Sequence, residues 1–184
     1  VAAVGLGCLT STRALAGGVP KGAGRSGVGS AVLAIAAALI AGREGAGRWL
    51  AVWLAEALAA CAIGIAGAVV KSRRGRTPMN PGPARKFFGG FAPPLGAGAF
   101  LTFALWQSGA SGLLPGAWLL LYGTGVVAGG AASVRVVPLM GLCFMVLGGG
   151  ALFAPAAWGN WILAAGFGGF HLLFGAIITV KYGG

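Results

Sequence analysis

Apolar residues dominate the chain in long runs, and charged residues and prolines fall between these runs. Six runs can be distinguished, each close to the roughly 20 residues that a helix needs to cross the hydrocarbon core of a bilayer. They cover residues 27–42, 49–70, 87–106, 113–132, 136–155 and 158–180. The pattern predicts an all-α membrane protein, a polytopic bundle of about six transmembrane helices.

Composition supports this interpretation and excludes a soluble enzyme. The chain of 184 residues is 58% hydrophobic and 8% charged, so a soluble domain would lack a polar shell. Its 37 glycines suit the close packing of helices in lipid. The net charge of +11 can indicate a nucleic-acid ligand, but most basic residues stand in short segments between apolar runs. We therefore expect no nucleic-acid partner.

The basic residues are divided unequally between the two ends of the predicted spans. If the six runs alternate in direction, one side receives 11 Lys and Arg residues, and the other receives only Arg43 and Arg48. Because positively charged loops are retained in the cytoplasm, both termini are predicted to be cytoplasmic. All six tryptophans fall near the span ends assigned to the outer face, where indole rings favour the membrane interface.

The polar segments divide the chain into four parts. Residues 1–26 form a Gly- and Ser-rich arm, 27–70 the first two spans, 71–86 a basic cytoplasmic loop, and 87–184 four further spans. The arm could instead contain a targeting signal, but no charged segment precedes its first apolar stretch. The basic loop is interpreted as a stop-transfer segment, with contact to anionic lipid as the alternative. Its basic residues are Lys71, Arg73, Arg74, Arg76, Arg85 and Lys86.

Two local motifs predict how the spans bend and pack. Pro93 and Pro94 stand in the first half of the third run and remove main-chain donors. This helix is expected to kink, or to break as helices do at transporter sites. In the fourth run, Gly125 and Gly129 are four residues apart, a spacing that lets another helix approach closely, within the bundle or from another subunit.

Glu56 lies within the second run, where a carboxylate is costly and is therefore a candidate functional group. Trp53 stands three residues earlier, on the same face of the helix. Together these side chains could hold a lipophilic cation through charge and cation–π attraction, and release it on protonation. The alternative is a protonated or hydrogen-bonded Glu56 that serves only to fix helix register.

His171, the one histidine of the chain, lies in the sixth run. A neutral imidazole between Gly and Phe residues could ligate the iron of haem or the magnesium of chlorophyll. One histidine cannot supply two axial ligands, so packing or a polar contact with Glu56 is the favoured interpretation. Cys8, Cys61 and Cys143 are isolated in the sequence, and no metal site is predicted.

Four segments resemble a family of uncharacterised bacterial inner-membrane proteins: residues 49–56, 85–95, 113–123 and 134–138. The likeness extends over residues 32–184. It implies a multi-pass protein of the bacterial inner (cytoplasmic) membrane. Proteins of this kind are encoded near winged-helix regulators, which hints at envelope or stress physiology, and the resemblance implies no activity or site.

The sequence favours a non-enzymatic membrane protein that acts through helix packing, as an accessory or scaffold subunit. This hypothesis explains the abundant glycines, and its partners are the lipid bilayer and other membrane subunits or further copies of the chain. The alternative is a small proton-coupled transporter of a lipophilic or cationic solute that uses Glu56. A haem- or chlorophyll-binding subunit through His171 comes third. No catalytic pair is visible for an enzyme within the membrane.

Overall fold

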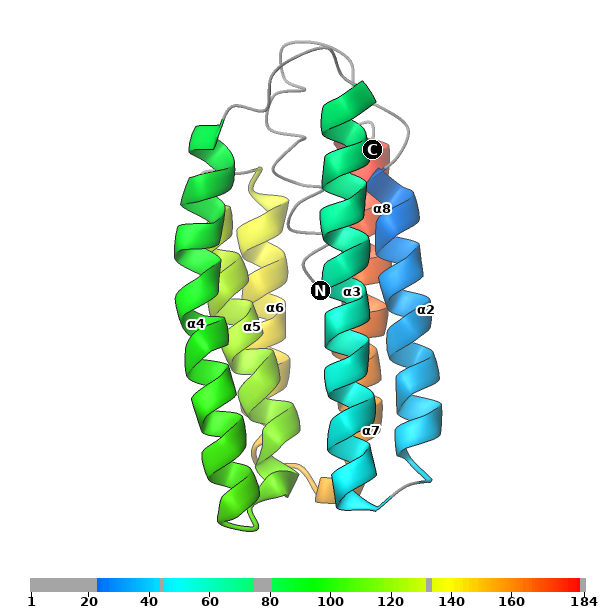
Figure 1. Cartoon of the computed structure of the whole chain (residues 1–184), viewed down its shortest axis with the longest axis vertical. Helices are drawn as coiled ribbons and strands as arrows, with labels where there is room; N and C mark the ends of the chain where they lie inside the picture. Colours follow the sequence, from blue (N-terminus) through cyan, green and yellow to red (C-terminus); the bar gives the residue numbers. More distant parts are fainter. Residues whose placement is uncertain (1–22, 44, 75–80, 132–133, 183–184) are drawn as a thin grey trace.

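The computed structural model is an all-helical bundle whose helices run alternately in opposite directions (Figure 1). It describes residues 23–43, 45–74, 81–131 and 134–182, and no β-strand occurs in these ranges. The helical-bundle class predicted from the sequence is confirmed. Membrane insertion and the number of spans stay predictions.

Six helical segments follow one another along the described chain. The first three are α2 (Ala23–Ala41), α3 (Ala46–Arg74) and α4 (Pro81–Gln107). The fourth is α5 (Leu114–Gly130), preceded by the short 3₁₀ helix η2 (Ser111–Leu113), and the fifth is α6 (Val136–Ala151). The sixth comprises η3 (Ala156–Trp158), α7 (Gly159–Leu163), the π-helix η4 (Ala164–Phe170) and α8 (His171–Tyr182).

In the part of the chain that the structure describes, three helices are long and apolar enough to cross a membrane. They are Phe88–Gln107, Ser111–Gly130 and Ala156–Ile178. Two shorter apolar helices, Ala31–Ala41 and Val136–Ala151, accompany them. Length and composition thus suggest a membrane location.

The ends of α3 and α4 correct the predicted extent of the basic loop, 71–86. α3 continues to Arg74 and α4 begins at Pro81, because Lys and Arg are good helix formers and proline is tolerated in a first turn. Arg76 lies outside the described residues. The basic residues that belong to the two helices are Lys71, Arg73, Arg74, Arg85 and Lys86.

Two other predicted boundaries are also wrong by a few residues. α2 begins at Ala23, so residues 23–26 of the predicted arm are helical. The rest of that arm, including Cys8, lies outside the described residues. α6 ends at Ala151, before the predicted limit at Pro155, because a residue that precedes proline is disfavoured in the helical conformation.

Pro93 and Pro94 lie inside α4 and do not break it, so the break, which was the alternative to a kink, is wrong. The two prolines remove only their own main-chain donors from a helix of 27 residues. A break would leave still more main-chain groups unpaired in apolar surroundings, which costs several kcal/mol per group. The helix therefore continues through the prolines.

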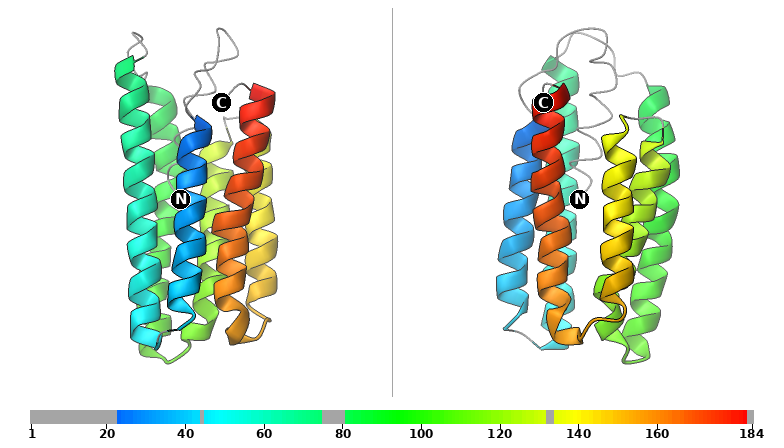
Figure 2. Two further views of the ribbon diagram at one scale, coloured as in Figure 1. Left: turned by 90° about the vertical axis from the view of Figure 1, so that its right-hand side faces the viewer. Right: turned by 180° about the vertical axis from the view of Figure 1, so that it is seen from behind.

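The six segments form two groups of three (Figure 2). In the first group α5 packs between α4 and α6. In the second group α2 packs between α3 and the segment that contains η4 and α8. The groups meet where α7 and η4 contact α5 and α6. On the other side of the bundle, α3 of the second group faces α4 of the first group.

Glycine brings α5 and α6 together main chain to main chain. A Cβ atom added to Gly148 would lie 2.6 Å from the main-chain nitrogen of Leu120 and 2.9 Å from the carbonyl oxygen of Gly116. A Cβ atom added to Gly141 would lie 2.7 Å from the carbonyl oxygen of Gly123. Real Cβ atoms do not approach other atoms this closely, so this helix pair depends on residues without side chains.

Gly125 and Gly129 lie on the side of α5 that meets α4 of the same chain. A Cβ atom on Gly125 would lie 2.8 Å from the ring of Phe91, and one on Gly90 would lie 2.8 Å from the main-chain nitrogen of Gly129. The groove at these two glycines is thus filled by α4. Their packing role is internal to the bundle in this structure.

Two neighbouring glycines of α6 give a direct test of this packing. Gly148→Ala is expected to lower the free energy of unfolding by about 1–3 kcal/mol, because the added methyl group meets main-chain atoms of α5. Gly149→Ala is the matched control, since nothing lies within 4 Å of its added Cβ. The control should be neutral or stabilising by up to about 1 kcal/mol. Unfolding in detergent, followed by helicity, measures both, and equal effects would contradict the packing described.

Candidate functional site

Among the described residues, three hydrogen-bonded groups hold polar side chains of the interior. The first joins Tyr122 of α5 to His171 at the start of α8, with 2.9 Å between the hydroxyl oxygen and Nε2. His171 Nδ1 lies 2.8 Å from the carbonyl oxygen of Phe167. A carbonyl only accepts, so Nδ1 carries a proton and donates it, while Nε2 accepts from Tyr122. Both ring nitrogens are thereby used.

The second group joins α3 to α7 at the end where α2 meets α3. The indole nitrogens of Trp49 and Trp53 both donate to the side-chain oxygen of Asn160, over 2.6 Å and 3.1 Å. One amide oxygen can accept both bonds because it has two lone pairs. Asn160 therefore fixes the position of α3 against the sixth segment.

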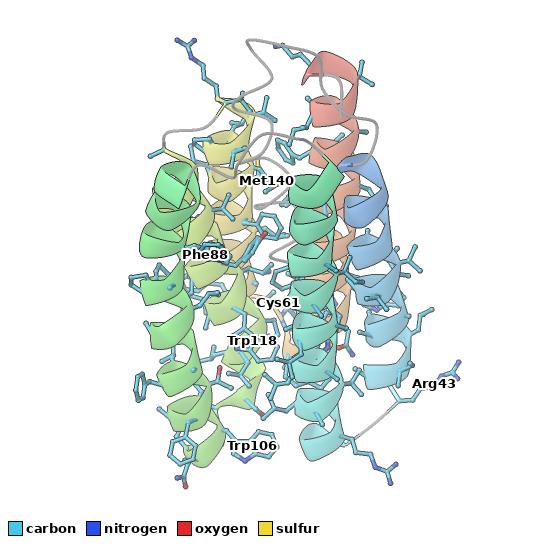
Figure 3. All side chains as sticks on the ribbon, turned by 45° about the horizontal axis from the view of Figure 1, so that its top comes forward. Arg43, Cys61, Phe88, Trp106, Trp118 and Met140 are labelled. Carbon is cyan, nitrogen blue, oxygen red and sulfur yellow. The ribbon has the colours of Figure 1, made fainter. Side chains whose placement is uncertain are left out.

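The third group joins α4 to α5. The indole nitrogen of Trp118 donates to the hydroxyl of Thr102 over 2.8 Å, and this hydroxyl donates to the carbonyl oxygen of Gly98 over 2.6 Å. The ring of Trp118 also stacks on Trp49 of α3, with centroids 5.6 Å apart and planes 15° from parallel. Trp118 thus lies between the two helix groups (Figure 3).

Glu56 is the exception to this pairing. Its side chain is 7% exposed, and Oε1 is buried with no hydrogen-bond partner among the described residues. It stands ten residues after the first residue of α3, or about 15 Å along the helix. A buried carboxyl group without a partner costs several kcal/mol when charged. Its position therefore calls for an explanation other than packing alone.

The carboxyl group of Glu56 lines a cavity of about 260 Å³ between α3, α4 and α5. The cavity wall is apolar and aromatic, with the rings of Trp53, Trp118, Tyr122 and Phe167. Leu54 and Leu95 also line it and are 46% and 45% exposed, so the cavity opens sideways between α3 and α4. It lies at the seam between the two helix groups.

The structure brings together some of the predicted site residues and separates others. Glu56, Trp53 and Pro94 all line the cavity. His171 is not among the lining residues and connects to the cavity through Tyr122. The suggested contact of His171 with Glu56 is thus replaced by a contact with a tyrosine.

The tryptophans gather toward one end of the bundle, but they do not all belong to its surface. Trp106, Trp158 and Trp161 are exposed, as expected for an interfacial belt. Trp53 is 2% exposed and lies inside the bundle. Asn160 provides a partner for its indole nitrogen in the interior, and its predicted depth near the membrane interface stays a prediction.

Several residues of this region were not predicted to belong to a site from the sequence, namely Tyr122, Thr102, Trp118, Phe167 and Asn160. Thr102 and Asn160 carried a usable signal, since each is a polar residue within a predicted apolar span. The aromatic residues carried none, because aromatic side chains are ordinary in such spans. Only the arrangement of α5 and η4 beside α3 shows their role.

The donor set near His171 bears on the haem and chlorophyll hypothesis. If Nε2 ligated a metal, it would lose its hydrogen bond with the hydroxyl of Tyr122. The imidazole is 1% exposed and is packed against the rings of Phe144 and Phe167, at 5.4 Å and 6.2 Å between centroids. The residues as placed do not fit a flat macrocycle at this position. No group of three or more His, Cys, Asp or Glu side chains occurs among the described residues.

Comparisons with known proteins add no relative: no protein-family model, curated protein or solved structure matches this chain. The family resemblance stated from the sequence is left as an expectation.

The pairing of Tyr122 with His171 can be tested through stability. Tyr122→Phe is expected to lower the free energy of unfolding by about 1–3 kcal/mol, because it leaves Nε2 of a buried histidine without a donor. Thr124→Ala on the same helix is the control, since the exposed Thr124 hydroxyl donates only to the carbonyl of Leu120 in its own helix. The control should change stability by less than about 0.5 kcal/mol. Equal losses in the two variants would show that the buried bond is unimportant.

Proposed function

We propose that this chain is a multi-pass membrane protein that binds and moves a small lipophilic solute through the cavity between α3, α4 and α5. One observation carries the proposal: the Glu56 carboxyl group is buried, lines the cavity and has no partner for Oε1 among the described residues. The neighbouring polar side chains of the interior are paired with one another. A carboxyl group kept for packing would be paired in the same way.

The membrane setting of the proposal rests on several features of the chain. In the described part, three helices have the length and apolar composition needed to cross a bilayer. α4 turns large apolar side chains outward, including Phe100 and Phe103, which are 82% and 65% exposed. Such exposed apolar side chains are suited to contact with lipid. We further propose six spans in the bacterial inner membrane, with the more basic end of the bundle in the cytoplasm.

The cavity is reached from the side in this proposal. Leu54 and Leu95 border an opening between α3 and α4, and both are apolar. A solute dissolved in the bilayer would meet this opening directly. A relative movement of the two helix groups would open or close the cavity, because it lies at the seam between them.

An accessory or scaffold role, non-enzymatic and dependent on helix packing, is the second candidate. It is favoured by outward apolar side chains such as Phe153 and Val146, which are 92% and 77% exposed and available to helices of other subunits or of further copies. It ranks second because it leaves unexplained why Oε1 of Glu56 has no hydrogen-bond partner among the described residues. A haem or chlorophyll subunit ranks third, since His171 is engaged by Tyr122.

Chemical labelling of Glu56 from the lipid phase tests access to the cavity. Diisopropylcarbodiimide is a small lipophilic reagent that adds to a protonated carboxyl group and leaves a stable N-acylurea. We expect it to label Glu56 of the full chain in lipid, as found by mass spectrometry of peptides. Gly98→Leu should slow the labelling at least about tenfold, because Gly98 lines the cavity and a leucine there fills it.

Gly96→Leu is the matched control for this experiment. Gly96 lies two residues earlier on α4, is not a lining residue, and has nothing within 4 Å of an added Cβ. Labelling in this variant should proceed at the rate of the unmodified chain. Failure of Glu56 to react in the unmodified chain, or equal rates in both leucine variants, would overturn the proposal and place the scaffold role first.

A further inference from the structure

We propose that the solute of this cavity is a monovalent organic cation with one charged group and an otherwise apolar body, and that Glu56 exchanges it for one proton. This inference rests on the proposed function and specifies its substrate class. It follows from which polar groups of the cavity wall are already engaged, and from which charges are present there.

The donors of the cavity wall are already used within the protein. The indole N–H of Trp53 is bonded to Asn160, and the indole N–H of Trp118 is bonded to Thr102. The hydroxyl of Thr102 donates to a carbonyl of its own helix, and the hydroxyl of Tyr122 is bonded to His171. A solute with several hydroxyl, carboxylate or phosphate groups would find few partners for them here. Sugars, amino acids and phosphorylated compounds are therefore excluded as good ligands.

The charges of the wall favour a cation. Among the described residues, Glu56 is the acidic lining residue, and no Lys or Arg lines the cavity. An anion would meet a carboxyl group and no compensating positive charge. A cation would meet the carboxylate together with the aromatic rings of Trp53, Trp118 and Tyr122, and cation–π attraction at a ring face strengthens when water is excluded. A single carboxylate balances a single positive charge.

The protonation of Glu56 follows from the free-energy cost of an unpaired charge in apolar surroundings. No described residue places a cation beside Glu56 in the cavity, so a carboxylate there would be unpaired among these residues and the carboxyl group holds a proton. Among the described residues, the titratable groups nearest to it across the cavity are Tyr122 of α5 and, through it, His171 of α8, and these are bonded to each other. α4 contributes no titratable side chain to the lining.

Binding of the cation then breaks one O–H bond. The neutral carboxyl group and the cation give a carboxylate–cation pair and one proton, which passes to water. No electrons are transferred, and the net charge of the site is zero before and after binding. The exchange is therefore one cation for one proton, and the protein carries the cation into the bilayer without carrying net charge.

The experiment uses the full chain in nanodiscs of phosphatidylcholine, with benzyltrimethylammonium as the cation and neopentylbenzene as its uncharged carbon analogue. Calorimetry in two buffers of different ionisation enthalpy gives the number of protons released on binding. We expect about one proton for each cation bound, since one carboxyl group serves the site. Protection of Glu56 from diisopropylcarbodiimide compares the two compounds, and the cation should protect at least about ten times better.

Two variants separate the role of Glu56 from general effects of charge. Glu56→Gln should weaken binding of benzyltrimethylammonium at least about tenfold and abolish proton release. Glu44→Gln is the control, because Glu44 is the other acidic residue of the chain and stands between α2 and α3. This control should bind the cation and release the proton as the unmodified chain does.

The outcomes distinguish this inference from the proposed function. If Glu56 is labelled by the carbodiimide but neopentylbenzene protects it as well as the cation does, the cavity is accessible and the cation assignment is wrong. Cation binding without proton release would likewise overturn the exchange. If Glu56 is not labelled and neither compound binds, both the proposed function and the substrate class fail.

Discussion

A polar group inside an apolar bundle must find its partner within the protein, because water is scarce there and an unpaired group is costly. The described interior meets this requirement by pairing side chains of different helices. Asn160 accepts hydrogen bonds from α3, Thr102 accepts one from Trp118, and His171 accepts one from Tyr122. Each pairing also fixes the relative position of two helices. Glu56 departs from this rule at the place where the bundle leaves a cavity. The same residue is thus an energetic cost for packing and, in the proposed function, the basis for binding a solute.

The two helix groups differ in how they are held together, and this difference places the cavity. α5 approaches α6 and α4 through glycines whose main-chain atoms are in contact with the facing helix. Such contacts leave no space for a ligand. α3 instead meets α5 through the large stacked rings of Trp49 and Trp118. These large rings separate the two helices at the stack, and the cavity lies beside Trp118, which lines it. Side-chain size along the seam therefore determines where the bundle is open.

The helices could be predicted from the sequence, whereas much of the site could not. Long apolar runs separated by charges predict the bundle, but helix ends depend on local propensity, so α3 extends through its basic residues to Arg74. Glu56 and Trp53 could be identified because an acid within an apolar run is costly and the two share a helix face. Tyr122 could not, because its role depends on α5 lying beside both α3 and α8. The break at Pro93, the alternative to a kink, failed because pattern alone does not weigh the main-chain bonds that a break would lose.

The protonation and pairing of Glu56 can be observed directly by infrared spectroscopy of the chain labelled with ¹³C-carboxyl glutamate in lipid. The spectrum is simple, because the chain contains only two acidic residues, Glu44 and Glu56, and Glu56→Gln identifies the signal. We predict a carbonyl band of a protonated carboxyl group with weak or no hydrogen bonding, replaced by carboxylate bands when benzyltrimethylammonium is added. A carboxylate in the absence of any cation, or a strongly hydrogen-bonded carbonyl band that the cation does not change, would contradict a cation-exchanging role for Glu56.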